Sequence, residues 1–264
     1  MKKQGPDHNG NRIRAAHALA RARHRGASRR GGKGLITLCI DIGGTGIKMI
    51  ALDAKGHPQN ERTRELTPKP STPAAVLKVV RSMIASQPRF DRVSVGFPGV
   101  VIGGVVHTAV NLGDRYWAQH DLRQDLEKHC RAPVRVINDA DLQGYGVIEG
   151  RGVELVLTLG TGLGSALFTS GRLVPNLELG HHPFKKGKTY EDRVCDRELK
   201  RLGKKTWSRR VKEAIEQLEP IFNYDLLHLG GGNAEHLRVK VPANVRIFTN
   251  VDGLTGGIRL WDAE

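Results

Sequence analysis

The sequence has no long apolar run, few cysteines and few aromatic residues, and each shortage excludes a class of protein. No apolar stretch approaches the roughly 20 residues that a membrane-spanning helix needs. The first 34 residues also lack the apolar segment of a secretory signal peptide. The three cysteines, Cys39, Cys130 and Cys195, are scattered and form no Cys-x-x-Cys pair. We therefore expect reduced thiols, a cytoplasmic location, no membrane association and no structural zinc site.

Acidic residues are outnumbered, with 27 Asp and Glu against 42 Lys and Arg, and the formal net charge is +15. Residues 1–34 hold ten Lys or Arg against one acid, Asp7, and residues 185–212 hold twelve against four acids. Such segments attract nucleic acid, an anionic membrane or polyphosphate, although a solvated face and a disordered tail explain them equally well. Aromatic residues make up only 5%, and neither a basic-aromatic stripe nor a helix-turn-helix pattern is present. Nucleic acid is therefore the less favoured partner.

Hydrophobic periodicity predicts an α/β protein after a basic, disordered tail at 1–34. Strands joined by glycine turns are expected within 35–56 and 153–174, and further strands at 92–101, 133–138, 224–230 and 244–250. Helices are expected at 72–87, 121–130, 139–150, 206–223 and 253–261. The theme of an apolar strand, a glycine turn and a second strand appears twice. This repetition predicts two related α/β domains, 35–138 and 139–252, facing each other across a central cleft, with 253–264 packing back on the first.

Two glycine turns carry the chemistry of anion binding. In "DIGGTGIK", Gly43, Gly44 and Gly46 let backbone N–H groups approach an anion, Thr45 adds a hydroxyl, and Asp41 and Lys48 flank the turn. The second turn, "LGTGLGS", offers the same chemistry from Gly160, Thr161, Gly162 and Gly164. Neither matches the Walker or the dinucleotide-binding spacing. A tight hairpin without a ligand explains either turn alone, but the two together favour a phosphate chain held from both sides.

Three further stretches place polar residues after apolar strands. Asn138 and Asp139 follow a buried-type strand, where α/β proteins place ligand contacts, although a helix N-cap is the simpler interpretation. Glu178 and His181 lie three residues apart and can share a ligand, but no third metal ligand has convincing spacing. The glycines 230–232 precede an expected helix and suit a phosphate or a nucleoside, with plain turn chemistry as the alternative.

Taken together, these pieces resemble the ROK family of sugar kinases, within the actin-like ATPase superfamily. The subgroup that the chain resembles is the bacterial polyphosphate glucokinases. The matching motifs occur in the family's order between about residues 36 and 261: "DIGGTGIK", "GFPGVV", "NDAD", "LGTGLGSAL", "ELGH", "LGGG" and "TGGI". The resemblance implies an actin-like (ribonuclease H-like) fold of two α/β domains. Many ROK proteins carry a cysteine-rich zinc motif after the Gly-His pair; here only Cys195 follows, as in the polyphosphate glucokinases, and no zinc site is expected.

The resemblance also implies a role for each candidate residue. Asp139 would be the catalytic base for the sugar 6-hydroxyl, and Asp41 would hold Mg²⁺ and its phosphates, directly or through water. Sugar hydroxyls would be bound by Asn138, Glu178, His181 and Glu191. The donor's phosphates would lie on Gly43, Gly44, Thr45 and Lys48 and on Gly160, Thr161, Gly162 and Gly164, with Gly230, Gly231 and Gly232 near an adenosine.

The function implied is phosphoryl transfer from polyphosphate, with ATP as a second donor, to glucose, with mannose as a second sugar, by a homodimer. One alternative is a strictly ATP-dependent ROK hexokinase. The other is a ROK-like sugar sensor or nucleic-acid-binding regulator without catalytic activity.

Overall fold

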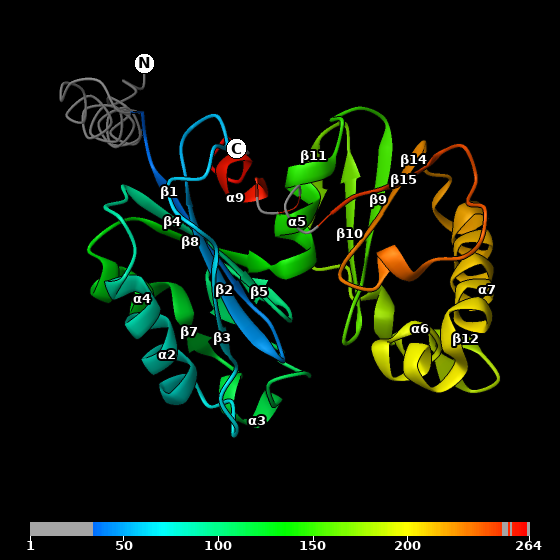
Figure 1. The fold of residues 1–264 in the computed structure, drawn as a ribbon, viewed down its shortest axis with the longest axis horizontal. Coiled ribbons are helices and arrows are strands. Elements are labelled where there is room, and N and C mark those ends of the chain that lie inside the picture. Colours follow the sequence, from blue (N-terminus) through cyan, green and yellow to red (C-terminus); the bar gives the residue numbers. More distant parts are fainter. Residues whose placement is uncertain (1–33, 250–252, 254, 263–264) are drawn as a thin grey trace, which may run out of the picture. The chain divides into compact units, whose positions relative to one another are not determined.

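Two five-stranded sheets form the framework of this protein in a computed structural model, which describes residues 34–249, 253 and 255–262 (Figure 1). The first sheet has the order β3-β2-β1-β4-β8. Its strands are β1 (Thr37–Ile42), β2 (Gly46–Leu52), β3 (Thr63–Leu66), β4 (Arg92–Phe97) and β8 (Val134–Asn138). β1 pairs antiparallel with β2, as predicted for the first glycine hairpin, and parallel with β4. The disordered tail predicted at 1–34 lies, apart from Gly34, outside the described residues.

The second sheet repeats the topology of the first. Its order is β11-β10-β9-β14-β15, with β9 (Val153–Leu159), β10 (Leu163–Thr169), β11 (Arg172–Val174), β14 (Leu226–Gly230) and β15 (Val245–Ile247). The central strand β9 again pairs antiparallel with the strand after the glycine turn and parallel with β14. The predicted duplication is therefore confirmed at the level of strand order and direction.

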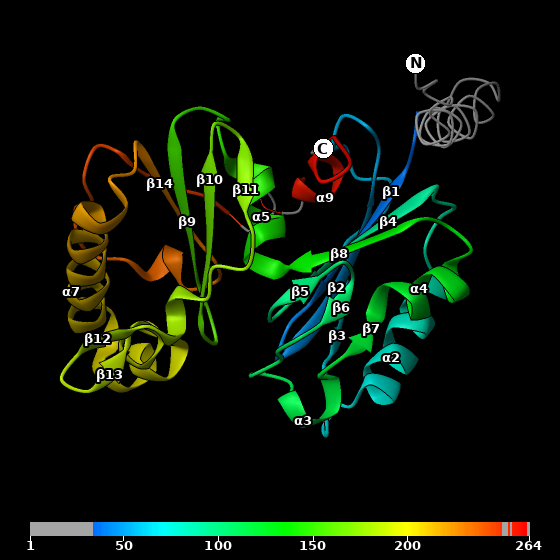
Figure 2. The same ribbon diagram turned by 180° about the vertical axis from the view of Figure 1, so that it is seen from behind.

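Alternating side chains of the first sheet pack against different helices. Leu38 and Ile40 share a core with α2 (Pro73–Ala85) and α4 (Leu122–Cys130), whereas Cys39 packs with Ile258 of α9 (Gly256–Arg259). Figure 2 shows α2 and α4 together on one side of this sheet. Both helices begin at side-chain caps, Thr72 and Asp121. A strand buried on both faces reads as a continuous apolar run, as "LITLCIDI" does.

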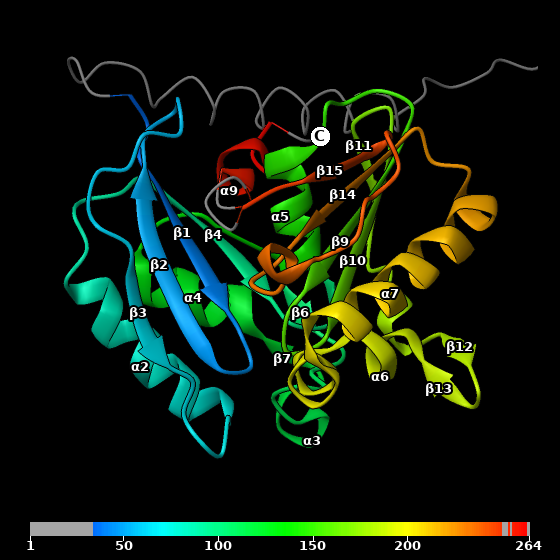
Figure 3. The same cartoon turned by 45° about the vertical axis from the view of Figure 1, so that its right-hand side comes forward.

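The second sheet is covered in the same way. Leu155 and Leu157 pack with the apolar side of α7 (Asp196–Phe222), and Val156 packs with α5 (Asp139–Val147) on the opposite face. Figure 3 shows α5 beside α9, and Arg259 of α9 donates to the carbonyl oxygens of Tyr145 and Ile148. α9 also contacts β1 and β4, as the domain prediction assumes. The domain boundaries at 138 and 252 stay a prediction.

Several short elements were not predicted, because they have too few residues to show a period. They are β3, β5 (Val101–Ile102), β6 (Val105–Val106), α3 (Asp114–Trp117), β7 (His120–Asp121), η1 (Leu179–His181), β12 (Pro183–Lys185), β13 (Lys188–Thr189) and α6 (Tyr190–Val194). The helix expected after the glycines 230–232 is present as the short 3-10 helix η2 (Ala234–His236). No helix within the described ranges is long and apolar enough to cross a membrane.

The helix predicted at 206–223 begins earlier than its sequence pattern indicates. α7 starts at Asp196 and passes through Gly203, whose φ of 72° and ψ of 159° interrupt the helical backbone. Its first part lies within the basic segment 185–212, whose charges hide the apolar period. The break is bridged by Glu198, which accepts hydrogen bonds from Arg201 and from Arg210, on opposite sides of Gly203.

We expect Glu198→Gln to destabilise the protein by about 1–2 kcal/mol at pH 7, since Arg201 is largely exposed and the loss is partly screened. The two arginines lower the pKa of Glu198 to about 2. A lowered folded-state pKa stabilises the fold above the unfolded-state pKa of about 4.3, and this contribution is lost as the pH falls toward 2. Urea unfolding should show the difference between variant and wild type shrinking between pH 5 and pH 2.5.

The matched control is Glu216→Gln, which removes an exposed i,i+4 pair with Lys212. It should change the unfolding free energy by less than about 0.5 kcal/mol. Equal losses in the two variants would contradict the bridging role of Glu198.

Candidate active site

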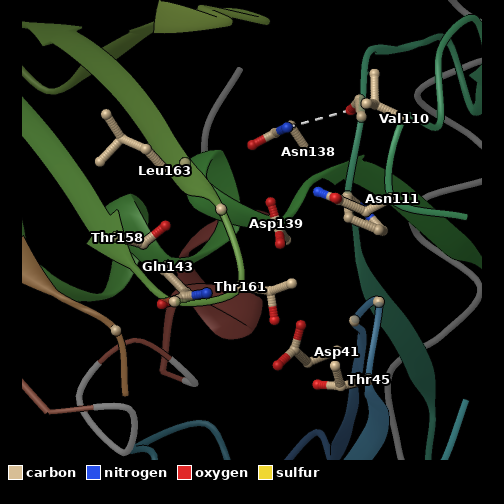
Figure 4. A pocket seen from close by; sticks show the side chains of 18 of the residues that line it. Asp41, Thr45, Val110, Asn111, Asn138, Asp139, Gln143, Thr158, Thr161 and Leu163 are labelled. Carbon is tan, nitrogen blue, oxygen red and sulfur yellow. Dashed lines mark hydrogen bonds between the residues drawn. The ribbon is translucent and has the colours of Figure 1, made fainter. Parts of the chain in front are cut away.

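A cavity of about 360 Å³ lies where the two glycine hairpins approach each other. Its volume is typical of small-molecule sites. The lining includes every residue predicted for the site except Gly230. In Figure 4 the side chains of Asp41, Asp139 and Thr161 point into the same space, although they come from β1, α5 and the second hairpin. The tertiary structure thus brings together residues up to 191 positions apart, from Asp41 to Gly232.

The first glycine turn is closed by a hydrogen bond from the Gly43 amide to the Gly46 carbonyl (3.0 Å). Asp41 and Lys48 are directly opposite in the β1–β2 register, and Lys48 Nζ lies 2.8 Å from Asp41 Oδ2. A Cβ at Gly43 would come within 2.9 Å of the Gly46 oxygen. Glycine at position 43 is therefore required by the turn itself, whatever the cavity binds.

The second turn divides its glycines between packing and open space. A Cβ at Gly162 would lie 2.1 Å from Glu191 Oε2, and one at Gly164 would lie 2.4 Å from Thr158 Oγ1. A Cβ at Gly160 would meet nothing within 4 Å. Of these three glycines, therefore, only Gly160 has no steric reason within the described protein to lack a side chain. Its open position leaves the backbone of the turn accessible from the cavity.

Asn138 is a helix cap, as the simpler interpretation of the sequence predicted. Its Oδ1 accepts hydrogen bonds from the amides of Ala140 (2.8 Å) and Asp141 (3.2 Å) at the start of α5. Its Nδ2 donates to the Gly99 carbonyl (3.2 Å) and to Glu178 Oε1 (3.3 Å). The amide thus fixes the start of α5 and holds Glu178 at the cavity. Its direct contact with a sugar stays a prediction.

Asp139 is the first residue of α5, at the carboxyl end of strand β8. Burial raises the pKa of its carboxyl group to about 8, and the nearby charges of Asp41, Glu178 and Asp141 add to the rise. Burial likewise raises the pKa of Asp141 to about 7 and the pKa of Glu178 above its usual range. A carboxylate with a pKa close to the working pH is well matched to accepting a proton during a reaction.

Glu178, His181 and Glu191 also line the cavity. His181 Nε2 lies 3.6 Å from Glu178 Oε2, and Glu191 Oε2 accepts the Leu163 amide (3.0 Å). Glu191 comes from α6, whose position was not predicted, and supports the second glycine turn from behind. Its predicted contact with a sugar stays a prediction, as do those of Glu178 and His181.

The third glycine cluster is split by the structure. Gly230 belongs to β14 and does not line the cavity, because the space beside its Cα is filled by the Phe248 ring, 2.2 Å from an added Cβ. Gly231 has a φ of +84° and packs on the Leu159 backbone, while Gly232 faces open space. Gly231 and Gly232 line the cavity, so they alone of the three are placed to contact a ligand.

Sequence reasoning missed several lining residues. The motif "GFPGVV" contains Pro98 and Gly99, but the sequence did not assign either of them a role. The others include Arg64, Thr108, Val110, Asn111, Gln143 and Thr158. Arg64 reaches the cavity through the pairing of β3 with β2, and Thr108, Val110 and Asn111 belong to the loop before α3. Gln143 and Thr158 lie on the predicted α5 and β9, next to motifs whose own residues drew the assignment.

The carboxylates of the cavity fit a magnesium ion that arrives with phosphates. Asp41 and Asp139 both line the cavity, and the charge of Asp41 helps to raise the pKa of Asp139, so a cation would relieve their repulsion. Among the described residues, no group of three or more His, Cys, Asp or Glu side chains is arranged to hold a metal ion. Mg²⁺ usually keeps several waters and takes one or two carboxylates plus substrate phosphates. The absence of a zinc site stays a prediction.

Comparison with known proteins gives consistent matches. A model of the ROK family matches residues 37–196. A polyphosphate glucokinase from Mycobacterium leprae is 34% identical over 237 residues, which cover 82% of this chain and 72% of the relative. A second polyphosphate glucokinase, from Mycobacterium tuberculosis strain H37Rv, is 36% identical over 77% of this chain and 80% of its own length.

Solved structures show the same fold. The inorganic polyphosphate/ATP-glucomannokinase from Arthrobacter sp. strain KM superposes with a TM-score of 0.74 at 34% identity, covering 86% of this chain and 97% of that one. A ROK glucokinase from Streptomyces griseus, in complex with glucose and AMPPNP, gives 0.70 at 19% identity, covering 85% and 98%, and shows the fold alone. The predicted actin-like α/β fold is therefore confirmed. The ROK family model matches more than half of this chain, and the two polyphosphate glucokinases are more than 30% identical to it. This chain therefore belongs to the ROK family.

Proposed function

We propose that this protein is a sugar kinase that transfers a phosphoryl group from inorganic polyphosphate, with ATP as a second donor, to the 6-hydroxyl of glucose. The observation that carries the proposal is the position of Asp139, a carboxyl group with a raised pKa in a cavity lined by two glycine turns. The relatives named polyphosphate glucokinase and polyphosphate/ATP-glucomannokinase support the choice of donor and sugar.

Each group in the cavity then has a role in an in-line transfer. The Asp139 carboxylate accepts the proton of the sugar hydroxyl while the new oxygen–phosphorus bond forms and the bond to the donor's leaving phosphate breaks. Glu178, held by Asn138, and His181 bind sugar hydroxyls and orient the nucleophile. The open backbone at Gly160 and the turn at Gly43–Thr45 receive phosphate oxygens from opposite sides.

Asp41 and Lys48 complete the donor side. Asp41 would hold Mg²⁺, directly or through water, and the ion would neutralise charge on the phosphate oxygens. Lys48, paired with Asp41 across the hairpin, adds a positive charge beside them. A cavity closed around the sugar excludes water, which would otherwise compete as the phosphoryl acceptor.

The basic segment 185–212 supports a polyanionic donor, although fewer of its charges are free than the sequence suggests. The Asp196 amide at the start of α7 donates to the Gly160 carbonyl (2.9 Å), so this segment adjoins the second glycine turn. Among the described residues, seven of its twelve cations have a carboxylate within 4.0 Å, as Lys185 has in Glu213. The cations without such a pair are Lys186, Lys188, Lys204, Lys205 and Arg209.

We expect glucose 6-phosphate formation with polyphosphate to be at least as fast as with ATP, and to weaken more with added salt. A chain of phosphates meets several cations at once, so its KM should rise about tenfold or more between 50 and 200 mM salt. The KM for ATP should rise less and the KM for glucose should stay constant. A coupled glucose 6-phosphate assay with the two donors tested separately measures all three.

Turnover with ATP and none with polyphosphate would contradict the polyphosphate proposal. That result would favour the strictly ATP-dependent hexokinase. Absence of turnover with either donor would favour the non-catalytic regulator. Mannose as a second sugar, a homodimer and a cytoplasmic location remain predictions of the family resemblance.

A further inference from the structure

Arg64 is a cation that lines the cavity and has no anionic partner among the described residues. Within residues 34–249, 253 and 255–262, Lys48 and Arg64 are the Lys and Arg side chains that line the cavity, and Lys48 lies 2.8 Å from Asp41. Within the described ranges, Arg64 has no carboxylate within 4.0 Å and no side-chain hydrogen bond. Arg64 is an exposed residue at the edge of the cavity, and the described part of the protein supplies no partner for its five donors.

The strand register places Arg64 beside Lys48. Arg64 lies on the edge strand β3, directly opposite Lys48 on β2, and opposite residues of an antiparallel pair share one face of a sheet. Its guanidinium group lies over the first glycine turn, because a Cβ at Gly46 would be 2.9 Å from Arg64 Nε and 3.3 Å from Nη2. The missing side chain at Gly46 therefore leaves room for this guanidinium group beside the phosphate turn.

Two cations on facing positions of neighbouring strands favour an anion beside them. Like charges directly opposite in a sheet repel, and among the described residues Asp41 pairs with Lys48 while no carboxylate pairs with Arg64. A guanidinium group matches the geometry of a phosphate, which it can bind through two parallel N–H groups. The neighbouring turn, Gly43–Thr45, is the part of the cavity to which the proposed function assigns the donor's phosphates.

We propose that Arg64 binds a non-transferred phosphate of the donor and that it selects donors carrying a chain of phosphates. The proposal rests on the proposed kinase function. The chemistry recognised, a phosphoanhydride chain, is shared by polyphosphate and by a nucleoside triphosphate. Arg64 holds the part of the chain that stays behind, so it acts on donor binding more than on the transfer step.

The test compares Arg64→Ala and Arg64→Lys with Arg62→Ala. Arg62 is an exposed arginine two residues earlier that does not line the cavity, and it serves as the matched control. We expect Arg64→Ala to raise the KM for the donor about tenfold, since it removes a charge-assisted, bidentate hydrogen bond from the guanidinium group to the phosphate. The donor KM of Arg64→Lys should lie between those of the wild type and Arg64→Ala, because lysine keeps the positive charge but lacks the two parallel N–H donors of the guanidinium group. The KM for glucose and the kcat should change less than twofold.

Binding measured without turnover separates this proposal from the kinase function. Titration calorimetry with tripolyphosphate, over a range of salt concentrations, should show weaker binding to Arg64→Ala and a salt slope smaller by about one than that of the wild type. Arg62→Ala should match the wild type. The assays with polyphosphate and ATP assign the contact: a rise in KM confined to one donor identifies that donor as the ligand of Arg64.

Equal effects of Arg62→Ala and Arg64→Ala, or unchanged tripolyphosphate binding in Arg64→Ala, would overturn the proposal. If the wild type binds tripolyphosphate through Arg64 but phosphorylates no glucose, the kinase function fails and the Arg64 site stands. If it phosphorylates glucose and Arg64→Ala leaves the donor KM unchanged, the Arg64 proposal fails and the kinase function stands.

Discussion

Replacing Asp139 by asparagine is expected to lower the kcat for glucose phosphorylation by about 10²–10⁴-fold, the usual contribution of a general base. The amide keeps the shape of the side chain and can still accept a hydrogen bond from the Ala140 amide, as Asp139 does (2.8 Å). It cannot take the hydroxyl proton. The coupled assay measures kcat, and calorimetric titration with glucose should show an affinity within about threefold of the wild type.

The pH dependence supplies a second measure of the same role. Burial and three neighbouring carboxylates raise the pKa of Asp139 to about 8. A base must be ionised to act, so kcat/KM should fall as the pH is lowered through a value well above the ordinary aspartate range of about 4. Asp141→Asn removes one of the raising charges and should move this fall to lower pH. Wild-type turnover in Asp139→Asn would refute the assignment of the base.

Glu178→Ala is expected to lower kcat/KM for glucose by about 10²-fold, because a charged group that binds buried hydroxyls is lost. Glu178 is suited to this role because its pKa is raised by burial and its Oε1 is fixed by Asn138. The donor KM should stay within twofold, since the phosphate turns lie elsewhere in the cavity. Initial rates with varied glucose at saturating donor give the comparison.

A panel of monodeoxy glucoses sharpens the test of Glu178. The wild type should discriminate against the analogue that lacks the hydroxyl bound by Glu178, and Glu178→Ala should lose that discrimination alone. Glu178→Gln keeps the shape of the side chain and loses its charge, so its discrimination should lie between that of the wild type and that of Glu178→Ala. A uniform loss for every analogue, with a lowered melting temperature, would mean that Glu178 acts through the fold and not through the sugar.

Much of the candidate site could be predicted because its motifs lie at strand ends. The strand before Asp41 reads as a continuous apolar run, and the one before Asn138 ends where a cap begins the next helix. An apolar strand and a helix cap each depend on a few neighbouring residues, so they can be predicted without knowing the rest of the fold. The repeat of strand, glycine turn and strand likewise predicted two similar sheets, which the identical strand orders confirm.

The predictions that failed did so where local sequence patterns are interrupted or too short to be seen. The predicted start of α7 was too late because Gly203 and a dense run of charges interrupt the helical period. In the structure, the hydrogen bond from Arg210 to Glu198 spans this break. The short β12 and β13 hairpin has too few residues to show a period. Gly230 resembles a ligand turn in sequence, but its environment is the Phe248 ring.

The sequence by itself thus determined the longer local elements and the two glycine turns, since hydrophobic period, capping and turn chemistry are properties of neighbouring residues. The resemblance of its motifs indicated the family. Only the tertiary structure decided what each glycine makes room for: Glu191 behind Gly162, Thr158 beside Gly164, the Arg64 guanidinium over Gly46, and open space at Gly160. It also decided that Arg64 lies beside Lys48 with no carboxylate partner in the part of the chain that the structure describes. These contacts join residues distant in the chain, so they depend on how the strands pair and the helices pack, which no local pattern records.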